Sequence, residues 1–151
     1  MQLVLVDSVS EGAKMGEVRT IVRLTNATDQ VLARRGELAA DEVHTYTADA
    51  LVDTGAVRTV LPPHVADQLG LAIRGQRMVE LADGRKENVG VTEAVEIDIN
   101  GRSTIEDALV LGDEVIIGQT VLETLDLLVD CKNRRLVSNP AHPDQPVVKI
   151  K

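Results

Sequence analysis

The residues in this sequence best suited to chemistry are Asp53-Thr54-Gly55, which follow the apolar run Ala50-Leu51-Val52. This pattern predicts a strand that delivers a carboxylate into a tight turn closed by glycine. The Thr54 hydroxyl can hydrogen-bond the backbone and lock the loop. Gly55 permits close approach of a partner loop or a substrate, because glycine has no Cβ. A capped turn after a strand is the simpler interpretation of the same triplet.

Other residue types that could do chemistry lack the spacing for it. Cys131 is the only cysteine and is expected at the end of a strand, which favours a structural thiol over a nucleophile. The alternating acids Glu93, Glu96 and Asp98 fit the solvated face of a strand. The three histidines are His44, His64 and His142. They are far apart and lack ligand-type spacing to the cysteine, so no metal and no cofactor are expected. The sequence has no Ser-His-Asp arrangement and no glycine-rich phosphate loop.

Composition restricts the class of protein. The 151 residues fit one domain, with 44% hydrophobic and 26% charged residues, as in soluble globular proteins. One Tyr and no Phe or Trp leave the core to Val, Leu, Ile and Ala, and β-branched residues favour strands. The net charge of −8 repels phosphate backbones, so nucleic acid is not expected as a partner. No apolar run approaches the roughly 20 residues that a membrane-spanning helix needs, so no membrane partner is expected.

Short strands separated by turn residues dominate the pattern and predict a mainly β domain with one or two short helices. Asp83-Gly84 and Asn100-Gly101 are favoured hairpin turns, and a turn is also expected at residues 26–29. Residues 30–43 are ambiguous, and Gly36 interrupts any helix there. Helices are expected at 63–69 and 119–125. Strands are expected at 18–24, 43–52, 77–82, 85–91, 95–99, from 103 onward, at 109–111, 115–117, 127–129 and 135–137, with an optional one at 147–150.

Leu51-Val52-Asp53-Thr54-Gly55-Ala56 resembles the active-site loop of retropepsin-like aspartic proteases, and other elements of that family follow at matching places. Thr59-Val60-Leu61 resembles the strand after the loop, and the hairpin around Asp83-Gly84 resembles the flap. Ile116-Ile117-Gly118 and the short helix after it resemble the element that packs beside the active-site loop. Leu127–Asp130 resembles the closing strand. The likeness covers about residues 45–137 and is greatest to single-domain bacterial members.

The resemblance implies a closed acid-protease β-barrel and an aspartic endopeptidase acting on a peptide or protein. It assigns the catalytic loop to Asp53, Thr54 and Gly55. The residues that it places against substrate are Ala56, Val57, Arg58, Ala82, Asp83, Gly84 and Ile117.

A single Asp-Thr-Gly implies two chains. Peptide hydrolysis of this type needs two carboxylates around one water, and because both cannot ionise, they share a proton. A chain with one such loop must borrow the other, and a two-fold symmetric homodimer places Asp53 against its own copy. The alternative is a catalytically inactive dimeric module that binds peptides on the same fold.

The sequence departs from the viral members of the family at three positions. Val57 and Arg58 replace residues that are usually acidic, which predicts a preference for acidic substrate side chains near Arg58. Gln119 stands where an Arg usually braces the dimer, so Val147–Ile150 could support the dimer instead. The lack of aromatics predicts an aliphatic substrate groove.

Location and domain limits follow from simpler signals. A lone cysteine fits a reducing compartment, and residues 1–6 lack the basic region of a signal peptide, so a cytoplasmic protein is expected. Because Met15 could be a start, residues 1–14 are interpreted as an extension or leader and residues 15–151 as one protease domain.

Overall fold

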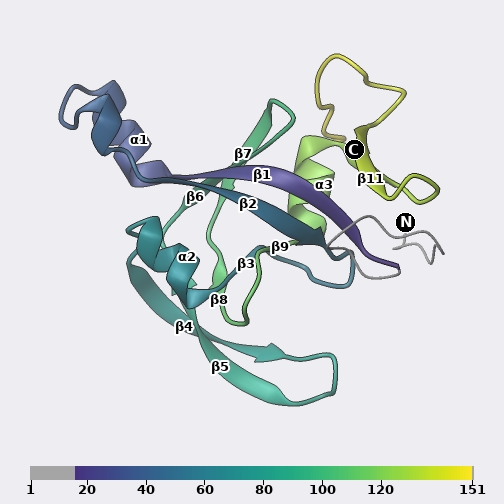
Figure 1. Cartoon of the computed structure of the whole chain (residues 1–151), viewed down its shortest axis with the longest axis horizontal. Coiled ribbons are helices and arrows are strands. Elements are labelled where there is room, and N and C mark those ends of the chain that lie inside the picture. The colour runs from purple at the N-terminus through teal and green to yellow at the C-terminus, as the bar shows by residue number, and fades with distance from the viewer. Residues whose placement is uncertain (1–15, 151) are drawn as a thin grey trace.

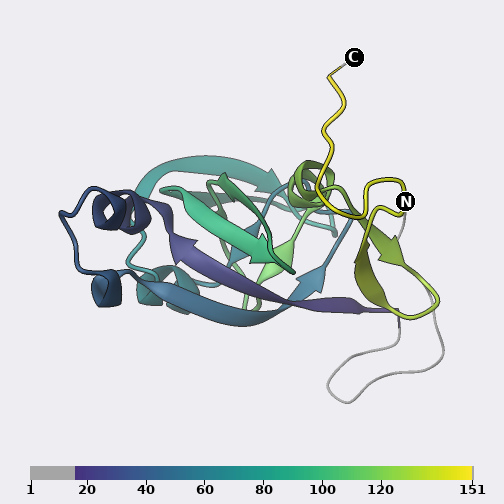
Figure 2. The same cartoon turned by 90° about the horizontal axis from the view of Figure 1, so that it is seen from above.

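The computed structural model describes residues 16–150 and is mainly β. Nine strands form one curled sheet in the order β4-β5-β8-β3-β9-β2-β1-β6-β7, and β10 and β11 form a separate hairpin. Helix α1 lies at one end of the molecule and β11 with the C-terminal segment at the other (Figures 1 and 2). The strands are β1 (Val18–Asn26), β2 (Thr45–Val52), β3 (Val60–Leu61), β4 (Ile73–Glu80), β5 (Lys86–Thr92), β6 (Val95–Ile99), β7 (Arg102–Glu106), β8 (Leu109–Val110), β9 (Ile116–Ile117), β10 (Leu127–Asp130) and β11 (Arg135–Ser138). The helices are α1 (Ala27–Arg34), the 3₁₀ turn η1 (Ala40–Glu42), α2 (Pro63–Gln68) and α3 (Gln119–Leu125).

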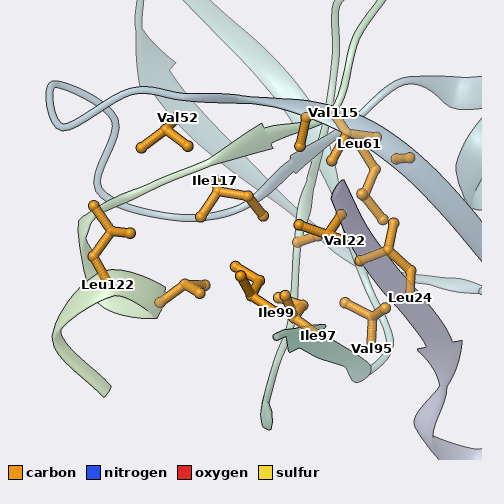
Figure 3. Packing of buried hydrophobic residues seen from close by; sticks show 14 of the residues in the cluster. Val22, Leu24, Val52, Leu61, Val95, Ile97, Ile99, Val115, Ile117 and Leu122 are labelled. Carbon is orange, nitrogen blue, oxygen red and sulfur yellow. The ribbon is translucent and has the colours of Figure 1, made fainter. Parts of the chain in front are cut away.

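The core is built from aliphatic residues on alternate positions of the strands. β6 has a strict period of two, and its three inward residues Val95, Ile97 and Ile99 are fully buried. They pack with residues of β1, β2, β9 and α3, as Figure 3 shows for Val22 and Ile117 among others. Burial of this apolar surface is the main favourable term for the fold. The aliphatic core expected from the composition is therefore present.

Tyr46, the only aromatic residue, lies on β2 opposite Leu24 of β1 and is partly buried against the core. It belongs to the longest ladder of the sheet, in which β1 and β2 pair antiparallel from Val18 to Thr25. The same strand β2 continues into Asp53.

The turn predicted at residues 26–29 is wrong, because these residues begin a helix. The Asn26 side chain accepts a hydrogen bond from the Asp29 N–H at 3.0 Å and so caps α1. Turn residues and N-cap residues are the same types, and the sequence did not separate the two cases. The ambiguous segment is resolved as α1 and η1, and Gly36, with φ of 76°, lies after the end of α1.

The two other helices occur where the sequence predicts them. α2 begins with Pro63 at its first position and is followed by Gly70 in the left-handed region, with φ of 63°. α3 ends at Leu125, and Asp126 follows in the left-handed region. Within residues 16–150, no helix is long and apolar enough to cross a membrane.

Both predicted hairpins are present. Asn100 and Gly101 have positive φ at the turn between β6 and β7, as tight hairpin turns require. β4 and β5 pair from Ile73 to Glu80, which is longer than the sequence predicted, because the exposed polar residues at the start of β4 gave no alternating signal.

The closed barrel expected from the resemblance is not confirmed. In the described part of the chain the sheet has two edges, β4 and β7, so it is curled but open. Residues 147–150 form no strand, so the optional terminal strand is wrong. The interpretation of residues 1–14 as an extension lies outside the described residues.

Replacing Ile97 with Ala should lower the free energy of unfolding by about 2–5 kcal/mol, because the side chain is fully buried and leaves a cavity. Ile21→Ala is the matched control, since Ile21 is 61% exposed on β1 and should cost less than about 1 kcal/mol. Denaturant unfolding measures both. Equal losses would contradict the assignment of the core to the inner face of β6.

Candidate active site

Asp53 is held at the end of an inner strand. β2 runs parallel to β9, with Val52 opposite Ile117, and the Asp53 N–H donates to the Ile117 carbonyl at 3.0 Å. Asp53 is half-buried, whereas Val52 before it is fully buried. The backbone of Asp53 is therefore fixed by a sheet hydrogen bond while its side chain remains accessible.

The turn after Asp53 holds one of its carboxylate oxygens. The Gly55 N–H donates to Asp53 Oδ1 at 2.9 Å, and the Ala56 N–H donates to the Asp53 carbonyl at 3.1 Å. A Cβ at Gly55 would lie 3.1 Å from that same Oδ1. Gly55 thus gives the carboxylate room to meet the backbone. The predicted lock by the Thr54 hydroxyl is not seen, since Thr54 makes no side-chain hydrogen bond within residues 16–150.

The N-terminus of α3 fixes the rest of the loop. The first N–H groups of a helix have no partner within it. In α3 the Gln119 N–H donates to the Ala56 carbonyl at 2.8 Å, and the Thr120 N–H donates to the Val57 carbonyl at 3.0 Å. A Cβ at Gly118 would lie 2.7–2.9 Å from backbone atoms of the loop. Only glycine therefore allows α3 to pack this closely against the loop. This explains why a glycine follows Ile116-Ile117 in the sequence.

Arg58 is engaged within its own chain. Its guanidinium forms an ion pair with the Asp107 carboxylate, which Arg74 of β4 also contacts. Burial acts to raise the pKa of Asp107, but the hydrogen bonds and charges of Arg74 and Arg58 outweigh it and lower the pKa of this carboxyl below its usual value. The predicted attraction of acidic substrates to Arg58 is weakened accordingly, because Asp107 already neutralises that charge.

Asp53 opens into a pocket of about 730 Å³. Six of the predicted site residues line it, and Thr54, Asp83, Gly84 and Ile117 do not. The Ile117 side chain is fully buried in the core, where Figure 3 shows it between Val52 and Ile99, so it offers no contact to a substrate. Ile116 lines the pocket instead. The lining residues are Asp53, Gly55, Ala56, Val57, Arg58, Val60, Arg77, Val79, Glu80, Leu81, Ala82, Leu109, Leu111, Gly112, Asp113, Glu114 and Ile116.

The hairpin of β4 and β5 forms one wall of this pocket through Arg77, Val79 and Leu81. These residues alternate along one arm, a signal in the sequence that could have identified them. The hairpin extends along the lower side of the molecule in Figure 1, and β4 is almost entirely exposed. Its tip is a turn in which Asp83 accepts hydrogen bonds from Arg85, which lower the pKa of Asp83, and Gly84 has φ of 86°.

The loop after β8 forms another part of the pocket wall and was not predicted. Leu111, Asp113 and Glu114 line the pocket there, and Glu114 is held by Arg19 of β1 through a 3.0 Å hydrogen bond. The walls are therefore mainly aliphatic, with acidic groups at the loop. Within residues 16–150, no group of three or more His, Cys, Asp or Glu side chains is placed to hold a metal ion.

A second hollow of similar size, about 720 Å³, lies beside α1. Its lining is dominated by polar side chains and by charged side chains of both signs, among them Arg23, Arg34, Asp41 and Asp98. It does not contain Asp53, so the aliphatic pocket at the Asp53 loop is the candidate active site.

A family model described as "gag-polyprotein putative aspartyl protease" matches residues 39–124, which is more than half of the chain. The match includes the Asp53 loop, the β4–β5 hairpin and most of α3. The chain belongs to this family of retropepsin-like aspartyl proteases.

The structure is similar to that of the EIAV protease complexed with the inhibitor HBY-793. The TM-score is 0.46 and the sequence identity 21%, over 76% of this chain and 91% of that chain. No curated protein matches the chain.

Gly118→Ala should lower the free energy of unfolding by about 1–3 kcal/mol, because the new methyl group meets loop backbone that must move. Gly75→Ala on β4 is the matched control: a Cβ there meets nothing within 4 Å, so its effect should stay within about 0.5 kcal/mol. Thermal or denaturant unfolding measures both. A neutral Gly118→Ala would show that α3 does not need this close seat.

Asp107→Asn should lower the free energy of unfolding at neutral pH by about 1–2 kcal/mol, by weakening the contacts with Arg58 and Arg74. Because the pKa of Asp107 is lowered in the folded state, its contribution is complete above the usual value of 3.8 and is lost as pH falls through the folded pKa. The difference between wild type and variant should therefore be constant from about pH 7 to pH 5 and shrink below about pH 4.

The exposed Asp144 supplies the control for this pH series. Asp144→Asn should give no comparable loss at any pH. A wild-type advantage over Asp107→Asn that grows on acidification would contradict the assignment.

Proposed function

We propose that the protein is an aspartic endopeptidase that hydrolyses peptide bonds through a water activated by Asp53 and its copy in a homodimer. The observation that supports this most directly is the Asp53 carboxylate. One of its oxygens is held by the Gly55 N–H, and it borders an aliphatic pocket that the β4–β5 hairpin helps to line, in a chain of the aspartyl protease family.

The second carboxylate would come from a second chain. The sequence contains one Asp-Thr-Gly, and the chemistry requires two carboxylates. The loop supports such an arrangement, since Gly55 is exposed and the Val57 side chain is 67% exposed beside Asp53. An exposed apolar side chain next to a half-buried carboxylate is a surface that a symmetric partner can cover.

The two aspartates would share one proton, and their pKa values would belong to the pair. The ionised member takes a proton from the water, which attacks the scissile carbonyl carbon. The protonated member donates its proton to the carbonyl oxygen. Collapse of the tetrahedral intermediate then breaks the C–N bond as the amine leaves with a proton.

The hairpin of β4 and β5 would close over the bound peptide and exclude water. Ala82, Asp83 and Gly84 lie at or beside its tip, and Gly84 permits the turn to reshape. Ala56, Val57 and the aliphatic residues of the walls would contact substrate side chains. Aliphatic substrate residues are favoured over acidic ones, because Arg58 is paired with Asp107 and the walls of the pocket are mainly aliphatic.

Asp53→Asn should reduce cleavage of denatured casein or a peptide library at pH 4–7 by at least about 100-fold, because it removes the proton-transfer group. The variant should retain the dimer and the unfolding free energy of the wild type. The sedimentation coefficient measured on the same samples reports the dimer.

Wild type that is dimeric but inactive would instead favour the second candidate, a module that binds peptides in the same pocket. The shared dyad would be contradicted if the wild type cleaved as a monomer. It would also be contradicted if symmetry-related Asp53 carboxylates lay far apart in the assembly.

A further inference from the structure

Glu106, at the end of β7, contacts both sides of the Asp53 loop. Its Oε2 accepts from the Thr59 N–H at 3.1 Å and from the Thr59 hydroxyl at 2.8 Å. Its Oε1 accepts from the Thr120 hydroxyl at 2.8 Å. Thr59 follows the loop directly, and Thr120 lies in the first turn of α3. One side chain thus joins the loop, the helix and the edge strand β7.

These contacts complete a closed set of hydrogen bonds around the loop. The Thr120 N–H already donates to the Val57 carbonyl, and the Thr59 carbonyl accepts from the Leu109 N–H at 3.0 Å. Thr59 is fully buried, so its N–H and hydroxyl would be unsatisfied without Glu106. Removing the Glu106 side chain therefore frees Thr59 at the end of the loop and breaks its link to Thr120 of α3.

The charge of Glu106 has no cationic partner in the described part of the chain, in contrast to the neighbouring Asp107. Ion pairing therefore does not account for a carboxylate at this position. What the carboxylate supplies is acceptor capacity, since its two oxygens can receive the three donors that converge there.

We propose that Glu106 is a positioning residue, which fixes the Asp53 loop against α3 by joining Thr59 to Thr120. The inference rests on the proposed peptidase function for its kinetic consequence, but not for its structural one. Misplacement of a reacting group by about 1 Å can cost on the order of 100-fold in rate. Loss of Glu106 should therefore act mainly on turnover and little on substrate affinity.

The test compares Glu106→Ala with Glu106→Gln in the full chain. Gln keeps the length of the side chain, its carbonyl oxygen can accept both Thr59 donors, and its NH₂ can donate to a rotated Thr120 hydroxyl. Glu96→Ala is the matched control, because Glu96 is a half-buried glutamate on the adjacent strand β6 that makes no hydrogen bond through its side chain within residues 16–150.

We expect Glu106→Ala to lower kcat at least about 10-fold with KM changed less than about threefold. Glu106→Gln and Glu96→Ala should stay within about threefold of wild type in both parameters. Unchanged kcat in Glu106→Ala would overturn the proposal. Equal losses in the Ala and Gln variants would also overturn it, by assigning the effect to the charge instead of the hydrogen bonds.

Amide hydrogen exchange makes the test independent of catalysis. The Ala56 and Thr120 N–H groups, which bond loop carbonyls, should exchange at least about 10-fold faster in Glu106→Ala but not in Glu106→Gln. If wild type shows no cleavage, the proposed function fails while this measurement still decides the role of Glu106. If Glu106→Ala does not fold, Thr120→Val removes a single contact, and unchanged exchange in that variant contradicts the proposal.

Discussion

The geometry around Asp53 depends on two hydrogen bonds between the start of α3 and the Asp53 loop. The first N–H groups of α3 have no partner within the helix, and they donate to two loop carbonyls that no strand pairs. The contact requires backbone to approach backbone, which Gly118 alone permits. β9 fixes the start of the loop, because the Ile117 carbonyl accepts a hydrogen bond from the Asp53 N–H. Since α3 also contributes Val121, Leu122 and Leu125 to the core, the stability of the domain and the position of the carboxylate share one element.

Much of the fold could be predicted because local chemistry and tertiary packing agree. The period of two in β6, Asn100-Gly101 at its turn and Pro63 at the start of α2 each specify one structure. Asn26 failed because its side chain suits both a turn and a helix cap, and only the residues packed around it decide. Whether the sheet closes depends on whether its edge strands β4 and β7 pair with each other, which they do not. No local sequence pattern predicts the presence or absence of such a pairing.

The residues of the candidate site likewise fall into those that the sequence predicted and those that it did not. Asp53 and Gly55 were found from the sequence because their roles depend on the backbone next to them. Gly118, which meets loop backbone distant in the sequence, was found only through the family resemblance. Glu106 and Asp107 were missed because their partners lie 47 to 49 residues away or on another element, and adjacent acids at a strand end look like solvated surface. Ile117 was assigned to the wrong side of its strand, since a two-residue strand is too short for its period to show which side chain faces the core.

The aliphatic core has a consequence for spectroscopy. Tyr46 is the only aromatic residue, so the near-ultraviolet absorption and intrinsic fluorescence of the side chains arise from one place. That place is on β2, paired with Leu24 and partly buried against the core, in the strand that ends at Asp53. The chain therefore carries a built-in, single-site optical probe. Its emission reports the surroundings of Tyr46 in the β1–β2 ladder, without the overlapping signals that tryptophans elsewhere in a protein would add.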